Sequence, residues 1–131
     1  MNTRTASCSC GALRVTCEGE PVRVSMCHCT ECQKRTGAPF GAQARWPASA
    51  VRIEGASTAW TRAGDSGNTA TFHFCPTCGS TVFYRIDQNP DVIAVALGNF
   101  ADKDFPPPIF SVYEERRHGW VSVPEGAERM D

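Results

Sequence analysis

The cysteines of this 131-residue chain constrain its fold more than any other feature. Seven of the eight lie in three tight groups, and the eighth, Cys17, stands alone between the first two. The groups are Cys8-Ser9-Cys10, Cys27-His28-Cys29-Thr30-Glu31-Cys32 and Cys75-Pro76-Thr77-Cys78. Cysteines one or two residues apart suit two ligands of one metal ion better than two halves of separate disulfides. The spacing therefore predicts metal binding.

The three groups contain two, three and two thiols, which indicates two metal sites of different kinds. A structural zinc ion usually has four protein ligands, whereas a catalytic zinc ion has three and keeps one position open. Pairing the first group with the third gives a closed site made of Cys8, Cys10, Cys75 and Cys78. The middle group is then a three-thiolate site with an open position, where chemistry can take place.

Other uses of eight cysteines compete with this interpretation. Four disulfides would also account for an even number, as in small secreted proteins. The N-terminus shows no apolar signal segment, however, so we expect a reducing cytoplasm, where disulfides are rare. Redox-active thiols and an iron–sulfur cluster stay open as alternatives, although no ferredoxin-type cysteine run is present. Zinc is the expected metal because all-thiolate tetrahedral sites select zinc or iron and sulfur.

Length and charge limit the class of protein. A chain of 131 residues is long enough for a modest core, so we expect a single zinc-binding domain over residues 1–131. The formal net charge of −1 gives no global reason to bind nucleic acid or an anionic membrane. No apolar run approaches the roughly 20 residues that a bilayer-spanning helix needs. We expect small-molecule partners, and the oligomeric state stays open.

Apolar and polar residues alternate with period two through most of the chain, which predicts β-strands. Residues 92–97 are apolar on both faces and predict a central strand that is covered on both sides. Strands at intervals of about ten residues favour a mainly β fold of two antiparallel sheets or a barrel-like arrangement. The alternating segments are 13–17, 22–26, 40–46, 70–74 and 82–86, with late strands expected at 109–113 and 120–123.

One helix signal stands out inside the middle cysteine group. Thr30 followed by Gln33 matches a capping box, and Gly37 provides a stop, so the pattern predicts a short helix over residues 31–36. The positive end of this helix lowers the pKa of the nearby thiols and favours the thiolates that bind metal.

Cys17 and the histidines are weaker candidates for ligands. Cys17 shares the apolar face of its predicted strand with Leu13 and Val15, so we expect a buried hydrophobic residue instead of a fourth ligand for the middle group. His28, between two predicted ligands, is expected to point away from the metal. His73 is expected to contact the backbone or a polar neighbour.

The three groups, together with Arg35-Thr36-Gly37-Ala38-Pro39-Phe40, resemble the signature of the glutathione-dependent formaldehyde-activating family, which also includes centromere protein V. The resemblance covers residues 8 to about 100. It implies a zinc-stabilised β-tent of two antiparallel sheets with one short helix. It also implies two zinc ions, a structural one on Cys8, Cys10, Cys75 and Cys78 and a catalytic one on Cys27, Cys29 and Cys32.

The activity that the resemblance implies is that of a carbon–sulfur lyase similar to S-(hydroxymethyl)glutathione synthase, which joins glutathione and formaldehyde or cleaves their adduct. Three thiolates outweigh the charge of a divalent zinc ion and make it a weak Lewis acid, so a substrate thiol suits the open position better than water.

The substrates themselves are less constrained by the sequence. Arg35, Thr36 and Gly37 are the candidate substrate-binding residues, and Lys34 and Arg45 are further candidates for contacting the carboxylates of glutathione. The main alternative function is a non-catalytic, zinc-stabilised binding module, and a thiol redox protein is the third.

Overall fold

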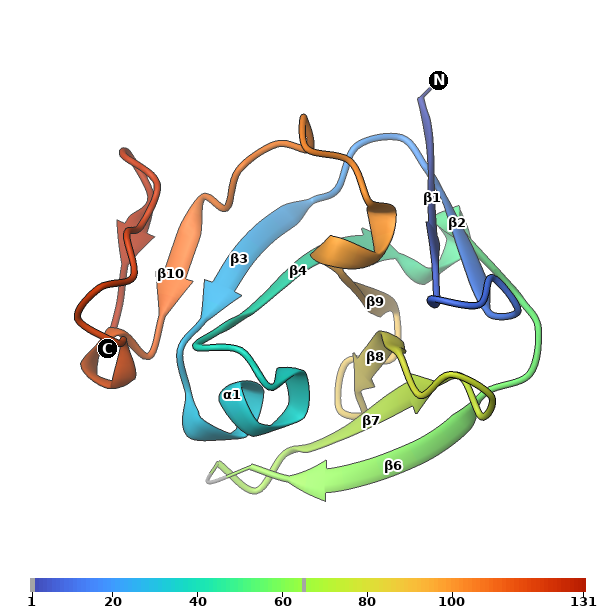
Figure 1. The fold of residues 1–131 in the computed structure, drawn as a ribbon, viewed down its shortest axis with the longest axis horizontal. Helices are drawn as coiled ribbons and strands as arrows, with labels where there is room; N and C mark the ends of the chain where they lie inside the picture. The colour runs from blue at the N-terminus through green and yellow to red at the C-terminus, as the bar shows by residue number, and fades with distance from the viewer. Residues whose placement is uncertain (1, 65) are drawn as a thin grey trace.

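The computed structural model describes residues 2–64 and 66–131; residues 1 and 65 lie outside the described part. The described residues form two β-sheets and one α-helix, which confirms the predicted mainly β fold (Figure 1). None of the described helices is long and apolar enough to cross a membrane. In chain order the elements are β1 (Thr3–Ser7), β2 (Arg14–Glu18), β3 (Arg23–Cys27), α1 (Thr30–Thr36), β4 (Gly41–Pro47), β5 (Val51–Glu54), β6 (Thr58–Ala63), β7 (Thr69–Phe74), β8 (Thr81–Ile86), β9 (Val92–Ala96), β10 (Phe110–Val112) and β11 (Glu128–Arg129), with three short 3₁₀ turns at Ala48–Ala50, Leu97–Phe100 and Glu114–Arg116.

The two sheets differ in size and in strand direction. The small sheet is antiparallel, with strand order β1-β2-β5. The large sheet has the order β11-β10-β3-β4-β9-β8-β7-β6, and its strands are antiparallel except that β10 runs parallel to both β3 and β11. The large sheet curves strongly, and α1 lies within the curve between β3 and β6 (Figure 1). Residues from both ends of the sheet can therefore reach the helix.

The main core lies between the two sheets. It joins Leu13, just before β2, and Val15 of β2 to Trp46 of β4 and to Ile93 and Val95 of β9. All five are nearly or fully buried. The indole N–H of Trp46 donates a hydrogen bond to a backbone carbonyl at 3.0 Å, so this large side chain is buried without an unsatisfied donor. The alternation that predicted β2 and β4 reflects burial of one face against this core, whereas β9 is covered on both faces, as predicted, because Ala94 packs in a second cluster.

Most predicted strands are present, but the segment Trp120–Val123 is not a strand. The backbone N–H of Val121 bonds to the carbonyl of His118 at 3.0 Å, which closes a turn, and Trp120 is 75% exposed. The prediction failed because three apolar residues within 120–123 give the pattern of a strand but pair with no strand in the described part of the chain. The edge position beside β10 is taken by β11 instead.

The helix begins one residue earlier than predicted, and the predicted capping box is wrong. The N-cap is Cys29, whose sulfur accepts a hydrogen bond from the backbone N–H of Cys32 at 3.3 Å. The Gln33 side chain donates to the carbonyl of His28 at 2.7 Å and so does not complete a capping box with Thr30. The predicted stop is confirmed, since Gly37 has φ 69° at the C-cap.

Gly55 provides a test of how the small sheet meets the first cysteine turn. A Cβ at this position would lie 2.0 Å from the carbonyl oxygen of Ala12, and φ is +98°. We expect Gly55→Ala to lower the free energy of unfolding by about 3 kcal/mol or more, because backbone strain and a backbone clash add. Gly126→Ala is the control, since φ is +87° there but the space is open. We expect it to cost only about 1–2 kcal/mol in denaturant unfolding. Equal losses for the two variants would contradict this account.

Candidate metal centres

Four cysteine sulfurs meet where the turn after β1 contacts the turn between β7 and β8. The sulfurs of Cys8, Cys10, Cys75 and Cys78 all lie within 4.8 Å of one another. Cys8 and Cys10 are 3.6 Å apart, and Cys10 and Cys75 are 3.7 Å apart. A tetrahedral zinc ion with Zn–S bonds of about 2.3 Å places its sulfurs about 3.8 Å from one another. The four-thiol group therefore fits such an ion in both ligand type and spacing.

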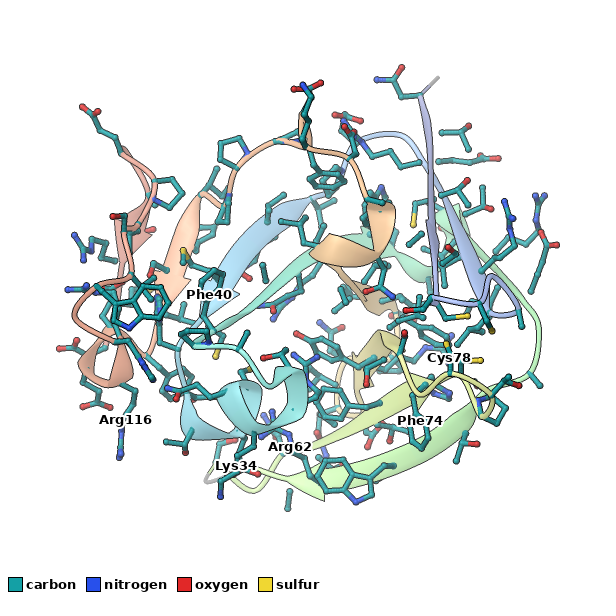
Figure 2. All side chains as sticks on the ribbon, viewed as in Figure 1. Lys34, Phe40, Arg62, Phe74, Cys78 and Arg116 are labelled. Atoms are coloured by element: carbon teal, nitrogen blue, oxygen red, sulfur yellow. The ribbon has the colours of Figure 1, made fainter. Side chains whose placement is uncertain are left out.

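Backbone N–H groups in these two turns point at the sulfurs. The N–H of Leu13 donates to Cys8 at 3.3 Å, and that of Thr77 donates to Cys75 at 3.4 Å. The Leu13 N–H lowers the pKa of the Cys8 thiol, and the Ser80 backbone and hydroxyl lower the pKa of Cys78 to about 5. Figure 2 shows sulfur atoms gathered beside Cys78. The turns thus favour the thiolate form, which is the form that binds metal, at Cys8 and Cys78.

The middle group forms a second cluster at the start of α1. Cys27 is the last residue of β3, Cys29 caps the helix, and Cys32 lies in its first turn. Their sulfurs also lie within 4.8 Å of one another. Hydrogen bonds from the other two thiols lower the pKa of Cys29, whereas the contact with Cys29 raises the pKa of Cys27. The three thiols therefore share negative charge that is centred on Cys29, the most exposed of the three.

Cys17 belongs to neither group of sulfurs in the described part of the chain. It is fully buried in the main core, beside Leu13 and Val15, as predicted. Burial raises the pKa of its thiol to about 12, so it stays protonated. The middle group consequently remains a group of three.

Two arginines bring positive charge to the three-thiol group. Arg35 of α1 and Arg62 of β6 both stack on the ring of Phe72, with 5.0 Å and 5.1 Å from guanidinium carbon to ring centre. After the hydrogen bonds from its neighbouring thiols and from the Cys32 backbone, Arg62 further lowers the pKa of Cys29. The Arg62 side chain also lies 3.8 Å from Glu31, and Figure 2 shows it below α1.

Gly41 leaves the room that Arg35 occupies. A Cβ at Gly41 would lie 3.0 Å from Nη2 of Arg35 and 3.4 Å from Cβ of Cys32. The guanidinium of Arg35 is thus held between the first residue of β4 and the aromatic rings of Phe72 and Tyr84. This position places a cation within electrostatic range of the Cys32 thiol.

The other predicted substrate contacts have local roles at the end of the helix. The Thr36 hydroxyl donates to the carbonyl of Cys32 at 2.9 Å and accepts from the N–H of Ala38 at 3.1 Å. Gly37 ends the helix, and Lys34 is exposed and pairs with Glu31 at 3.8 Å. Substrate binding by Arg35, Thr36 and Gly37 stays a prediction.

His28 belongs to a buried hydrogen-bond chain that links the middle group to the late part of the chain. Its Nε2 lies 2.9 Å from the hydroxyl of Ser111, which in turn bonds to the carboxylate of Glu114. Because Ser111 donates to Glu114, Nε2 of His28 carries the proton, and the buried Nδ1 has no hydrogen-bond partner within the described part of the chain. Sequence reasoning missed Ser111 and Glu114 because both are more than 80 residues from His28 in the chain. His73 contacts Ser57 at 3.1 Å, as expected for a polar partner.

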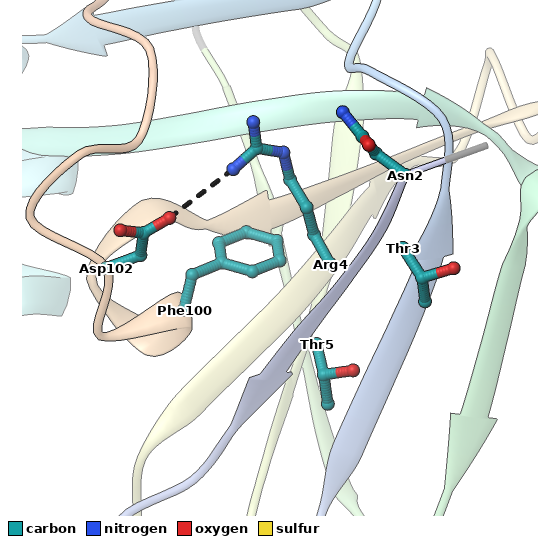
Figure 3. A pocket seen from close by; sticks show the side chains of 6 residues that line it. All are labelled: Asn2, Thr3, Arg4, Thr5, Phe100 and Asp102. Atoms are coloured by element: carbon teal, nitrogen blue, oxygen red, sulfur yellow. Dashed lines mark hydrogen bonds and ion pairs between the residues drawn. The ribbon is translucent and has the colours of Figure 1, made fainter.

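A cavity beside the N-terminal strand does not coincide with either cysteine group. It measures about 360 Å³ and is lined by Asn2, Thr3, Arg4, Thr5, Phe100 and Asp102 (Figure 3). The guanidinium of Arg4 is already paired with Glu20 at 2.8 Å and Asp102 at 3.5 Å. Its lining contains no thiol and no uncompensated charge, so the candidate site is the cysteine clusters and not this cavity.

The fold and these clusters define a mainly β protein with two thiol groups that can each hold a metal ion. The family model described as glutathione-dependent formaldehyde-activating enzyme matches residues 3–116, and the chain belongs to this family. Membership implies an activity related to glutathione and formaldehyde.

A solved structure supports the same fold. The crystal structure of a Rhodobacter sphaeroides protein is 19% identical, with a TM-score of 0.57, and the match covers 97% of this chain and 99% of the other. At this identity the likeness concerns the fold alone. None of the curated proteins compared with the chain matches it significantly.

Serine substitutions should separate the two thiol groups by their effect on stability. We expect Cys75→Ser to lower the free energy of unfolding of the metal-loaded protein by about 3 kcal/mol or more, because binding energy at a closed site is folding energy. Cys29→Ser should cost only about 1 kcal/mol, since serine is itself a good N-cap. Chelator-controlled denaturant unfolding measures both. Similar losses at the two positions would show that both sites are structural.

Proposed function

We propose that the protein is a zinc-dependent carbon–sulfur lyase that forms or cleaves the S-hydroxymethyl adduct of a small thiol and an aldehyde. The substrates of the family, glutathione and formaldehyde, are the expected pair. The observation that carries the proposal is that the middle group has three thiols and Cys17 lies elsewhere, in the core. Three protein ligands leave one position of a tetrahedral ion for substrate.

The donor sets support two zinc ions. Cys8, Cys10, Cys75 and Cys78 would hold the structural ion, and the middle group would hold the catalytic one. The catalytic ion, when bound, supplies a Lewis acid that keeps a substrate thiol deprotonated and therefore nucleophilic. The free thiols of all eight cysteines fit a reducing compartment such as the cytoplasm. The core shared by the two sheets supports one zinc-binding domain over residues 1–131.

The proposed reaction forms one carbon–sulfur bond and transfers one proton. The thiol loses its proton, its sulfur attacks the aldehyde carbon, and a carbon–sulfur bond forms. The electron pair of the carbonyl double bond moves to oxygen, which takes up a proton, and the reverse sequence cleaves the adduct. The contribution of the chain is to hold both reactants together and to place the charges of Arg35 and Arg62 beside the sulfurs, where they favour an anionic thiolate.

One observation also favours the alternative of a non-catalytic module. Cys27 belongs to the large sheet, whereas Cys29 and Cys32 belong to α1, so an ion on these three residues would fasten the helix to the sheet. A site that serves only this purpose needs no exchangeable position. The two functions therefore differ in whether a thiol can bind to the site.

Metal analysis and thiol binding test the proposal together. We expect purified protein to carry up to two zinc ions, one resistant to chelators and one labile, because a closed four-ligand site exchanges less readily than an open one. Glutathione should bind in titration calorimetry only while the labile ion is present, and more tightly as pH rises toward formation of the thiolate. Iron in place of zinc, or glutathione binding to metal-free protein with equal affinity, would reject this mechanism.

Catalysis is tested by the exchange of labelled formaldehyde with its glutathione adduct, followed by exchange NMR. Each of Cys27→Ser, Cys29→Ser and Cys32→Ser should return the exchange rate to the spontaneous rate, since each removes a ligand of the labile ion. Cys17→Ala is the matched control, because it removes a buried thiol from the core and leaves both groups of ligands intact. Binding of glutathione without acceleration would identify a binding module.

A further inference from the structure

A row of side chains crosses the large sheet on the face that carries α1. Residues paired directly across neighbouring strands point to the same face, with Cβ atoms about 4.5–5.5 Å apart. Arg35 of α1 stacks on two members of this row, which places the helix on the same face. In order from β3 to β6, the row consists of Arg23, Arg45, Ala94, Tyr84, Phe72 and Trp60. We call it the sheet row.

The smallest member of the sheet row leaves a gap beside its cations. Ala94 stands between Arg45 and Tyr84, and all three line a cavity of about 20 Å³. This volume is sufficient for one water-sized polar group, such as a carboxylate oxygen.

The charge at this end of the sheet row is only weakly compensated. Arg23 stacks on the ring of Phe110 at 4.2 Å, and Glu128 attracts it from beyond ion-pair distance. Arg23 and Arg45 are direct cross-strand partners, and burial, followed by the charge of Arg45, lowers the pKa of Arg23. Nε of Arg23 is buried without a hydrogen-bond partner within residues 2–64 and 66–131. In the same residues, neither arginine lies within ion-pair distance of a carboxylate. Adjacent cations that are partly buried and have no directly paired anion are unfavourable, so this place favours an anionic ligand.

Tyr84, which lines the gap, connects it to the three-thiol group. Tyr84 lies within electrostatic range of Cys27 and Cys32, and the guanidinium of Arg35 is 5.6 Å from its ring centre. From β8, the strands that carry Arg45 and Arg23 are two and three positions away. With about 4.8 Å between neighbouring strands, Arg45 and Arg23 therefore lie about 10 Å and 15 Å from Tyr84 across the sheet. An extended tripeptide covers about 10 Å, whereas a single residue covers about 3.5 Å.

We infer that Arg45, assisted by Arg23, binds a carboxylate of the thiol substrate and so selects an anionic peptide thiol of about three residues over a small neutral thiol. Arginine suits this task because its planar guanidinium can donate two parallel hydrogen bonds to a carboxylate. The inference rests on the proposed function for the position of the thiol. In this role Arg45 determines which thiol substrate binds and takes no part in forming or breaking the carbon–sulfur bond.

Binding of S-methylglutathione tests the inference without catalysis, since this probe has both carboxylates but no free thiol. In titration calorimetry on the zinc-loaded protein, Arg45→Gln should weaken binding about 10- to 100-fold, the loss expected for a hydrogen bond between charged groups. Arg85→Gln is the matched control: Arg85 follows Tyr84 on β8, points to the opposite face, and also has a buried Nε without a partner in the described part of the chain. It should leave the Kd unchanged.

Three further measurements distinguish this inference from the proposed function. The diethyl ester of S-methylglutathione should bind the unsubstituted protein as weakly as the free acid binds the Arg45→Gln variant. Arg45→Lys, which keeps the charge but not the planar fork, should restore part of the affinity. In the exchange assay, Arg45→Gln should raise KM for glutathione and leave KM for 2-mercaptoethanol unchanged.

Equal Kd values for the unsubstituted protein and Arg45→Gln would overturn the inference, as would tight binding of the ester or no binding of the acid. Loss of all exchange activity with binding of S-methylglutathione intact would instead reject the proposed function. If Arg45→Gln lowers the unfolding temperature, Arg23→Gln provides the same comparison at the second cation of the sheet row.

Discussion

Contact between two distant turns holds the two sheets in their relative position. Cys10 and Cys75 are 65 residues apart in the chain, yet their sulfurs lie 3.7 Å apart. Beside them, the hydroxyls of Ser9 and Ser80 are 3.0 Å apart. The first turn follows a strand of the small sheet, and the second joins two strands of the large sheet. A metal ion at this contact would close a long loop, which is where such a link restricts the unfolded chain most.

The three-thiol group depends on much shorter connections. Its members span six residues, and the cap that Cys29 forms with the N–H of Cys32 brings two of them together without any distant contact. The helix cap brings Cys29 and Cys32 together, but the third thiol, Cys27, is the last residue of β3 and is placed by the large sheet. The order of dependence runs from the long-range contact to the sheet, and from the sheet to the candidate catalytic group.

Features set by neighbours in the sequence could be predicted, and features set by distant partners could not. The spacing of the cysteines predicted which thiols meet. Alternation predicted β2 because one face is buried in the core, and the continuous apolar run predicted β9 because both of its faces are covered. The cap was predicted wrongly because Gln33 bonds to His28 instead of the helix start. The sheet row depends on register across six strands, so Arg23 and Arg45 cannot be paired from the sequence alone.

Gly41 shows how the size of a single residue can determine the electrostatics of a site. The chain leaves Cβ space empty at the start of β4, and the end of the Arg35 side chain fills it. In a protein with this fold and a larger residue at that position, the cation would be displaced from the thiols, and the same three sulfurs would hold more of their charge unopposed. Tuning of sulfur reactivity in this architecture can therefore proceed through a residue that has no functional group of its own.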